Sequence, residues 1–293
     1  MDIDGVFQKA VSAIDAGNVT VLEQVLGAHP ELVRERLDAP GGWLREKVGG
    51  ALDGFFQRPY LLWFVAEDPV RNGKLPRSIA QIASTIIRAA EGARVDSLQE
   101  QLDYALRLVC WSWIARQCGV QIELIDVLIE AGASIEGGSD AAIYNGNFEA
   151  AEHLLKRGAA VTLSTALCLG RWADVERLAR TATLRAKQDA FVLAALKGKA
   201  EGLGRMLALG VEPTTVSAQT QSHGTALHHA VWSGSLDAVK VLVEAGADRN
   251  RRDTVHNATP LNWAEHALEG QKQESEKQYR EIAAYLREKG AKE

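Results

Sequence analysis

The feature of this chain that most constrains its fold is a pair of glycines, twelve residues apart, that recurs along the sequence. An alanine stands four residues before the first glycine of each pair, where a small side chain lets two helices approach closely. Self-similar spacing of this kind is the signature of stacked repeats. In each unit we therefore predict a helix, a turn at the first glycine, a second helix and an end at the second glycine. The pairs are Gly146 and Gly158, Gly198 and Gly210, and Gly234 and Gly246.

The stretch HGTALHHAVWSGSLDAVKVLVEAGADRN, residues 223 to 250, shows the unit most clearly. Thr225 is a residue type that caps a helix with its hydroxyl. Apolar residues at helical spacing give each of the two following segments one apolar face. The sequence predicts helices from Thr225 to about Ser233 and from about Leu236 to Ala245.

This stretch resembles an ankyrin repeat, whose signature is T-P-L-H-x-A-A-x-x-G, a second helix and G-A-D-x-N. The next unit keeps TPLNWAEH, from Thr259 to His266. The resemblance is specific in residues 222 to 267, and the recurring phase extends it over most of the chain, in the irregular style of bacterial ankyrin proteins. It implies an all-α solenoid of stacked helix-turn-helix units in a single domain, residues 1–293. About eight units are expected, beginning near Val6, Tyr60, Leu102, Asp140, Thr165, Asp189, Thr225 and Thr259.

The units are spaced irregularly. Gly146, Gly170, Gly198 and Gly234 follow one another at 24, 28 and 36 residues, whereas an ankyrin unit has about 33. A helix pair needs most of the shorter lengths, so the missing residues must come from the β-hairpin finger that joins units in the family. We predict short or missing fingers at residues 158–166 and 180–189. Residues 211–224 are long enough for a complete finger.

Residues 39–101 are expected to hold an irregular insertion and the second unit. Trp43, Phe55 and Phe56 are interpreted in two ways, as a cover for the first repeat's core or as an exposed apolar site, and the cover is favoured because terminal repeats need one. Residues 256–293 are expected to form a C-terminal capping unit. In that unit ALEGQKQESEKQ, residues 267–278, is expected to separate the two helices.

The family resemblance also suggests which residues contact a partner. It implies that His228 ties adjacent turns together through hydrogen bonds. It further implies that two positions before each turn glycine line a concave surface of inner helices. Tyr144 and Trp232 are the favoured anchors because aromatic residues are enriched at interface hot spots, although a tryptophan of a solenoid can equally pack against the next repeat. The predicted partner-binding row is Gln117, Tyr144, Asn145, Leu169, Lys197, Trp232, Ser233 and His266.

Composition narrows the class of partner. The net charge is −5, with 33 Lys and Arg spread among 38 Asp and Glu, so we expect no nucleic-acid partner. The longest apolar run, Tyr60 to Ala66, is too short to span a bilayer, so no membrane association is expected.

An odd number of cysteines without a C-x-x-C pair fits a reducing compartment. We expect a cytoplasmic monomer, with self-association through an apolar patch as an alternative.

Motifs for chemistry are scarce. The chain has no phosphate loop, zinc-binding H-E-x-x-H helix, nucleophile elbow or dinucleotide fingerprint. No catalytic residue, metal ligand or cofactor is therefore predicted, and an enzyme is the less favoured class. The sequence favours a module that binds another protein through its concave inner-helix surface. The alternative is an enzyme or small-molecule binder with a pocket between the 39–101 insertion and the concave face.

Overall fold

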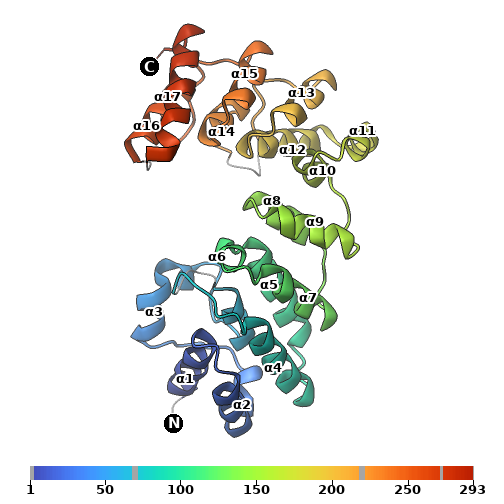
Figure 1. The fold of residues 1–293 in the computed structure, drawn as a ribbon, viewed down its shortest axis with the longest axis vertical. Helices are drawn as coiled ribbons and strands as arrows, with labels where there is room; N and C mark the ends of the chain where they lie inside the picture. Colours follow the sequence, from blue (N-terminus) through green and yellow to red (C-terminus); the bar gives the residue numbers. More distant parts are fainter. Residues whose placement is uncertain (1–2, 68–71, 218–221, 271–272, 293) are drawn as a thin grey trace. The chain divides into compact units, whose positions relative to one another are not determined.

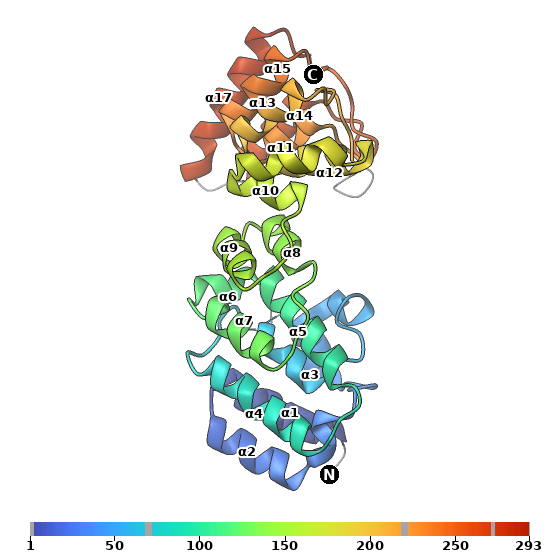
Figure 2. The same cartoon turned by 90° about the vertical axis from the view of Figure 1, so that its right-hand side faces the viewer.

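The computed structural model describes residues 3–67, 72–217, 222–270 and 273–292, and all of their regular secondary structure is helical (Figure 1). Its contacts divide the chain into two compact units, Met1–Ala160 and Val161–Glu293, called unit 1 and unit 2 below. Within each unit, consecutive helices form pairs, and the pairs stack (Figures 1 and 2). The predicted all-α solenoid of helix-turn-helix units is confirmed. The single domain over residues 1–293 stays a prediction, because each unit is compact by itself.

Unit 1 contains four stacked pairs. The first helices of the pairs stack on one side of the unit, where α5 contacts the first helices of the preceding and of the following pair. The second helices of the pairs stack on the other side. The first members are α1 (Ile3–Asp15), η3 (Leu61–Ala66), α5 (Leu98–Trp111) continued by α6 (Trp113–Gln117), and α8 (Gly138–Tyr144). The second members are α2 (Val19–Ala28), α4 (Ile79–Gly92), α7 (Gln121–Glu130) and α9 (Phe148–Lys156), and the remaining elements are η1 (Pro30–Val33), α3 (Gly42–Val48) and η2 (Gly49–Asp53).

Unit 2 repeats the same arrangement with four further pairs. Its first helices contact one another in chain order and form what we call the first-helix row. They are α10 (Leu163–Leu169), α12 (Leu184–Leu196), α14 (Ala226–Trp232) and α16 (Pro260–Gly270). The second helices are α11 (Trp172–Thr181), α13 (Ala200–Ala208), α15 (Leu236–Glu244) and α17 (Gln273–Glu288).

The marker glycines turn the chain between the two helices of a pair. Gly146, Gly198 and Gly234 have φ values of +75°, +63° and +73°, a left-handed conformation that costs glycine nothing and other residues about 1 kcal/mol or more. At Gly198 a side chain would also meet Ser235 Cβ at 2.7 Å. Ser235 belongs to the next pair, and its hydroxyl donates to the Gly198 carbonyl at 3.2 Å. The recurring glycine therefore serves both the turn and the contact between neighbouring pairs.

The links between pairs are short where the sequence predicts it. Only six residues separate α9 from α10, and two separate α11 from α12, and none of these residues is in a strand. The prediction of missing fingers is therefore confirmed for these links. Residues 211–224 form no strand in their described part, where a turn brings Glu212 O to Thr215 N and Ala226 N donates to Thr215 O at 2.9 Å. Residues 218–221 of this segment lie outside the described residues.

The three aromatic residues that the sequence singles out in the 39–101 insertion differ in their burial and their contacts. Phe56 is fully buried and packs edge to face on Phe64, with ring centroids 5.1 Å apart. The Trp43 indole N–H donates to Asp4 Oδ1 at 2.8 Å and ties the insertion to α1. The Trp43 contact agrees with a cover of the first repeat, whereas Phe56 packs on η3 of the second pair. Phe55 is 43% exposed and matches the alternative of an exposed apolar group.

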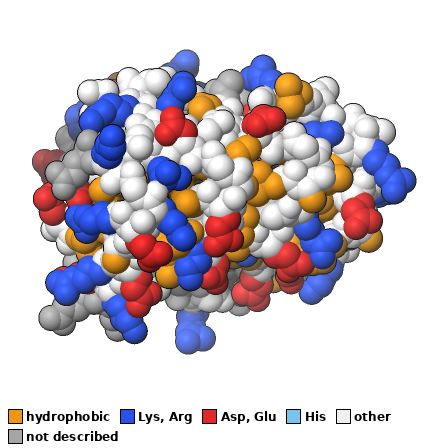
Figure 3. Space-filling model, turned by 90° about the horizontal axis from the view of Figure 1, so that it is seen from above, with side chains coloured by type: hydrophobic (Ala, Val, Ile, Leu, Met, Phe, Trp, Pro, Cys, Tyr) orange, Lys and Arg blue, Asp and Glu red, His pale blue; other side chains and the backbone are white. Residues whose placement is uncertain are grey.

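The C-terminal pair differs from the sequence prediction. Residues 267–278 do not separate the two helices, since α16 runs to Gly270 and α17 already begins at Gln273. The reason is that Gln, Glu and Lys favour helix, so the segment extends α17 instead of forming a long loop. Ile282, Ala283 and Leu286 of α17 are buried. Over the face drawn in Figure 3, basic and acidic side chains are interspersed and do not gather by sign.

Within the described residues, no helix combines the length and the apolar character needed to cross a bilayer.

Candidate functional site

A cavity of about 560 Å³ opens on the first-helix row of unit 2. The segment around it is rich in imidazoles, since five of the seven histidines of the chain lie between residues 223 and 266. Leu196, Ala258 and Asn262 form the smaller part of the lining. The larger part consists of indole and imidazole rings, those of Trp232, Trp263, His223, His229, His256 and His266. We call this cavity the Trp/His pocket.

The helical repeat places these rings side by side. His229 and Trp232 are three residues apart on α14, and Trp263 and His266 are three residues apart on α16, so each pair lies on one helix face. The segments that precede α14 and α16 add His223 and His256. The pocket is thus built from two adjacent helix-turn-helix pairs, closed by α12 through Leu196.

Trp263 is the ring that the others surround. The Trp232 and Trp263 ring centroids are 6.0 Å apart with planes at 80°, so the two indoles form adjoining walls. His223 lies 5.5 Å from Trp263 and is tilted by 32°, whereas His229 lies 5.7 Å away and is edge-on at 82°. Offset and edge-to-face arrangements are the favoured ones for aromatic rings. They leave ring faces and edges available to a guest.

The Asp253 carboxylate supports this wall of the pocket through hydrogen bonds. Its carboxylate accepts hydrogen bonds from the backbone N–H of Val255 at 2.9 Å and of His256 at 2.6 Å. It also accepts from the Ala258 N–H at 3.2 Å and from the Trp263 indole at 2.9 Å. Burial raises its pKa, but these four hydrogen bonds to the charged form outweigh burial and bring the pKa to about 2. Asp253 is therefore an anion that orients Trp263 and the His256 segment.

His228 has the structural role that the family resemblance implies. Its Nδ1 accepts from the Thr225 N–H at 3.1 Å and lies 2.8 Å from the Thr225 hydroxyl. The ring proton is therefore on Nε2, which donates to the Ala258 carbonyl of the next pair at 3.1 Å. Burial lowers the pKa of His228, so the ring stays neutral. It is not among the residues that line the pocket.

The structure brings two of the eight predicted contact residues into the pocket. Trp232 is 46% exposed at its wall, with its carbonyl accepting from Tyr279 OH at 2.9 Å, and His266 lines it from α16. Ser233 lies just outside, with its hydroxyl donating to Ala230 O at 2.7 Å. The others are at least partly exposed on their helix ends: Leu169 and Lys197 in unit 2, and Gln117, Tyr144 and Asn145 in unit 1.

Sequence reasoning missed Trp263, His229, His223 and His256. Trp263 and His229 occupy the same position of the repeat, directly after the fourth residue of the T-P-L-H motif. They stand one helical turn before His266 and Trp232, the residues that the sequence predicts as contacts. That spacing is a signal that could have found them. Nothing in the sequence indicates His223 and His256, because their loops are placed by contacts between neighbouring pairs.

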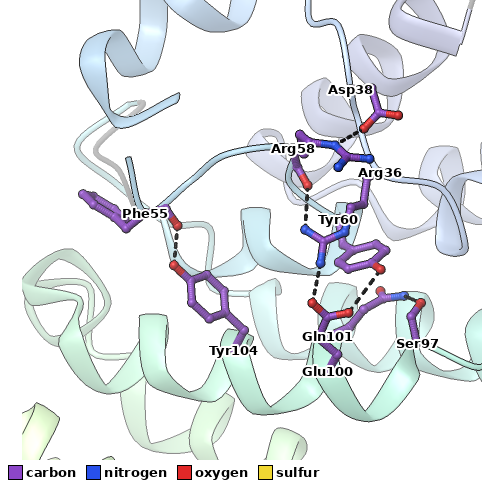
Figure 4. A network of polar contacts seen from close by, with 9 residues as sticks. All are labelled: Arg36, Asp38, Phe55, Arg58, Tyr60, Ser97, Glu100, Gln101 and Tyr104. Atoms are coloured by element: carbon purple, nitrogen blue, oxygen red, sulfur yellow. Dashed lines mark hydrogen bonds and ion pairs between the residues drawn. The ribbon is translucent and has the colours of Figure 1, made fainter. Parts of the chain in front are cut away.

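A second cavity, of about 600 Å³, lies in unit 1 where the sequence places the alternative pocket. Its walls come from the insertion, through Phe55 and Trp63, and from α5, through Glu100, Tyr104 and Arg107. The Tyr104 hydroxyl donates to the Phe55 carbonyl, which ties the insertion to α5 (Figure 4).

Most charges around this second cavity are paired. Arg36 stacks on the Tyr60 ring at 4.2 Å and donates to both the Arg58 carbonyl and Glu100 (Figure 4). The other carboxylate oxygen of Glu100 accepts from Tyr60 OH at 3.3 Å. Asp103, which also lines the cavity, accepts from the Ser134 N–H at 2.7 Å. Two donors remain, because the exposed Arg107 and the buried Trp63 indole N–H have no polar partner among the described residues.

Metal ligation is a further possibility for a histidine-rich wall. Within residues 3–67, 72–217, 222–270 and 273–292, no three or more His, Cys, Asp or Glu side chains are arranged to hold a metal ion.

Comparison with known proteins agrees with the repeat architecture. A family model described as ankyrin repeats (3 copies) matches residues 141–253 and 191–292, which together cover more than half of the chain. Over 60 residues, or 20% of this chain, the sequence is 43% identical to the E3 ubiquitin-protein ligase KEG of Arabidopsis thaliana, and the alignment covers 3% of that protein. Among solved structures, the ankyrin repeat domain of human ASB11 matches with a TM-score of 0.42 and 13% identity, covering 97% of this chain and 98% of that one.

Proposed function

The chain belongs to the ankyrin repeat family, and we propose that unit 2 binds a protein partner by receiving one of its side chains in the Trp/His pocket. Ankyrin repeats are in general modules for protein–protein interaction, and repeat arrays present extended binding surfaces. Our proposal assigns this general role to the Trp/His pocket on the first-helix row of unit 2.

The observation that carries the proposal is the exposed Trp232 beside a ring-lined cavity. Trp232 is 46% exposed although its neighbours on α14 are buried. Large aromatic side chains that border a concave, mostly apolar site supply most of the binding energy at interfaces. The backbone carbonyl of Trp232 accepts a hydrogen bond from the Tyr279 hydroxyl, and its indole ring packs against the ring of Trp263. A preformed wall of this kind binds without a large ordering cost.

The remaining predicted residues extend this surface. Ser233, Lys197 and Leu169 lie on the same row of unit 2, and we propose that they contact the partner along this row, outside the pocket. Gln117, Tyr144 and Asn145 occupy the matching positions of unit 1 and are proposed as a separate set of contacts. The partner is a protein and not a nucleic acid, given the net charge of −5. We further propose that the chain acts as a cytoplasmic monomer without a cofactor, of the irregular bacterial type.

Replacing Trp232 with alanine should abolish capture of the partner. We expect the affinity to fall about thirtyfold, because a hot-spot aromatic contributes roughly 2 kcal/mol. The measurement is affinity capture from the source organism's lysate with the intact chain and with the Trp232→Ala chain, followed by titration of the captured protein. Leu209→Ala is the matched control, since Leu209 is 45% exposed in the same unit but ends a second helix, α13.

The expected result is a protein held by the intact chain and by Leu209→Ala but not by Trp232→Ala, with circular dichroism equal for all three. If Trp232→Ala captures the same protein with unchanged affinity, the pocket is not the binding site. Loss of capture in both variants would show that the partner's contacts extend beyond the first-helix row to the end of α13.

A second candidate function is small-molecule binding by the cavity of unit 1. The observation that favours it is the pair of donors left over there, the guanidinium of Arg107 and the buried indole N–H of Trp63, next to the rings of Phe55 and Tyr104. Such a site suits a small molecule with an aromatic ring and an anionic group, since a buried donor without a partner costs about 1–3 kcal/mol.

This candidate predicts that aromatic carboxylates bind unit 1 and that Arg107→Ala weakens them about tenfold, the loss of one charge-assisted hydrogen bond. Ligand-observed NMR with benzoate and its ring-substituted analogues measures this. Arg180→Ala, which removes an exposed arginine of unit 2, is the control. Binding that is equal in both variants, or absent from the intact chain, would remove the small-molecule function.

A further inference from the structure

The Trp/His pocket has an unusual balance of polar groups. Four imidazoles and one amide line it, and the described lining contains no carboxylate, ammonium or guanidinium group. The Asn262 side-chain oxygen already accepts from the Thr259 N–H at 3.0 Å and from its hydroxyl at 3.1 Å. Its NH₂ group is therefore the part left to interact with a guest. The wall offers donors from Asn262 and from histidine, and histidine gains a further donor on protonation.

The charges on the elements that surround the pocket are engaged elsewhere. The two carboxylate oxygens of Asp253 accept hydrogen bonds from four N–H groups, one of which is the Trp263 indole N–H. Arg252 donates to the Asn257 carbonyl at 2.6 Å. On α16, Glu265 pairs with Arg287 of α17, and Glu269 lies 3.8 Å from the ring of His266. Glu269 is the carboxylate found beside a pocket imidazole, that of the exposed His266.

The imidazoles are close enough to interact. His223 lies 6.0 Å from His229 and 6.3 Å from His256, between ring centroids. Protonated imidazoles at these distances would place like charges side by side in this wall. A guest carboxylate would relieve that repulsion, whereas a guest cation would add to it.

We propose that the side chain received by the Trp/His pocket is a carboxylate, presented by a partner segment in which an acidic residue neighbours an aromatic or aliphatic one. This rests on the proposed protein-binding function and names the chemistry of its partner. The apolar neighbour packs on the indole walls of Trp232 and Trp263. The carboxylate accepts hydrogen bonds from the Asn262 amide and from His223 and His256, which lie on loops at the pocket wall.

The proposal fixes the sign of the pH dependence. A bound carboxylate raises the pKa of an adjacent imidazole, so the complex takes up protons on binding. Affinity then increases on mild acidification and falls as the pH rises through the imidazole pKa of the complex. Each imidazole whose pKa rises by one unit changes the affinity by up to about tenfold. An apolar or cationic guest predicts no change, or the opposite change.

The test uses the full chain and three blocked dipeptides, acetyl-Phe-Glu-amide, acetyl-Phe-Gln-amide and acetyl-Phe-Lys-amide. Binding is followed at pH 7.8 and pH 5.8 through the indole N–H signals of Trp232 and Trp263 in NMR spectra, assigned by single substitutions. We expect the Glu peptide to bind about threefold more tightly than the Gln peptide at pH 7.8 and about tenfold or more at pH 5.8. In His223→Gln/His256→Gln the additional preference at pH 5.8 should disappear.

The controls keep the outcome interpretable. Glutamine retains hydrogen bonding without a titrating ring, and neither His223 nor His256 is fully buried, so the fold is expected to survive. His153→Gln is the matched control, because His153 pairs with Asp126 in unit 1 at 2.7 Å and lies outside the pocket.

Equal binding of the Glu and Gln peptides at both pH values would overturn the carboxylate assignment and leave the proposed function standing. Tighter binding of the Lys peptide, or a pH effect that persists in His223→Gln/His256→Gln, would overturn it as well. If no peptide shifts the Trp232 and Trp263 signals, the inference fails. The capture experiment with Trp232→Ala then decides the protein-binding function by itself.

Discussion

Replacing Phe191 with alanine should lower the free energy of unfolding of unit 2 by about 3–5 kcal/mol. Phe191 is fully buried on α12 and belongs to one apolar cluster with Leu167 of α10, Met206 of α13 and Leu227 of α14. Because α12 contacts the first helices on both sides of it, the lost volume affects neighbouring pairs as well as its own. Stacked repeats depend on such interfaces for their stability.

The measurement for Phe191→Ala is hydrogen exchange resolved by peptide, which reports on unit 2 separately from unit 1. Leu184→Ala is the control on the same helix, since Leu184 is 67% exposed and its removal should change stability by less than about 0.5 kcal/mol. Equal protection in the two variants would show that the cluster around α12 does not carry the stability of unit 2.

Replacing Asp253 with asparagine should lower the free energy of unfolding of unit 2 by about 3 kcal/mol at neutral pH. Asp253 is 4% exposed and accepts four hydrogen bonds. An asparagine turns one acceptor into an NH₂ group that faces N–H donors, and it removes the charge that makes the remaining bonds strong. The indole of Trp263 loses its anchor, so the Trp232→Ala and Asp253→Asn chains should both bind the partner weakly.

Acid should reduce the difference between the Asp253→Asn chain and the unchanged chain. The pKa of Asp253 is about 2 in the folded protein and about 3.9 in an unfolded chain. A lowered folded-state pKa contributes stability that is present above pH 4 and lost as the pH falls to 2. This contribution is about 2–3 kcal/mol. Urea unfolding at pH 7, 4, 3 and 2 measures it.

Asp248→Asn is the matched control for this experiment, because Asp248 is an exposed carboxylate of the same segment that accepts from one backbone N–H, that of Asn250, at 2.9 Å. Its replacement should change stability by less than about 1 kcal/mol. A difference between Asp253→Asn and the unchanged chain that stays constant from pH 7 to pH 2 would contradict the assigned role of the charge.

The sequence by itself determined the repeat. Glycines such as Gly198 and Gly234 recur because the turn between two helices needs a left-handed residue, and the segment from Thr225 to His228 returns as Thr259 to Asn262 in the next pair. These are local requirements that return from pair to pair, so they leave a periodic signal. The same signal led to Trp232 and His266, which stand at fixed distances from their turns.

Only the tertiary structure decided which residues meet at the pocket. His223 and His256 lie on loops whose course is set by contacts across pairs, such as Thr254 N to His223 O and the four bonds to Asp253. Phe55 is exposed and Phe56 is buried although they are adjacent in the sequence. The physical reason is that a repeat pattern encodes how a unit folds and stacks, while a binding pocket forms from irregular residues of several units, whose positions follow from packing and leave no period in the sequence.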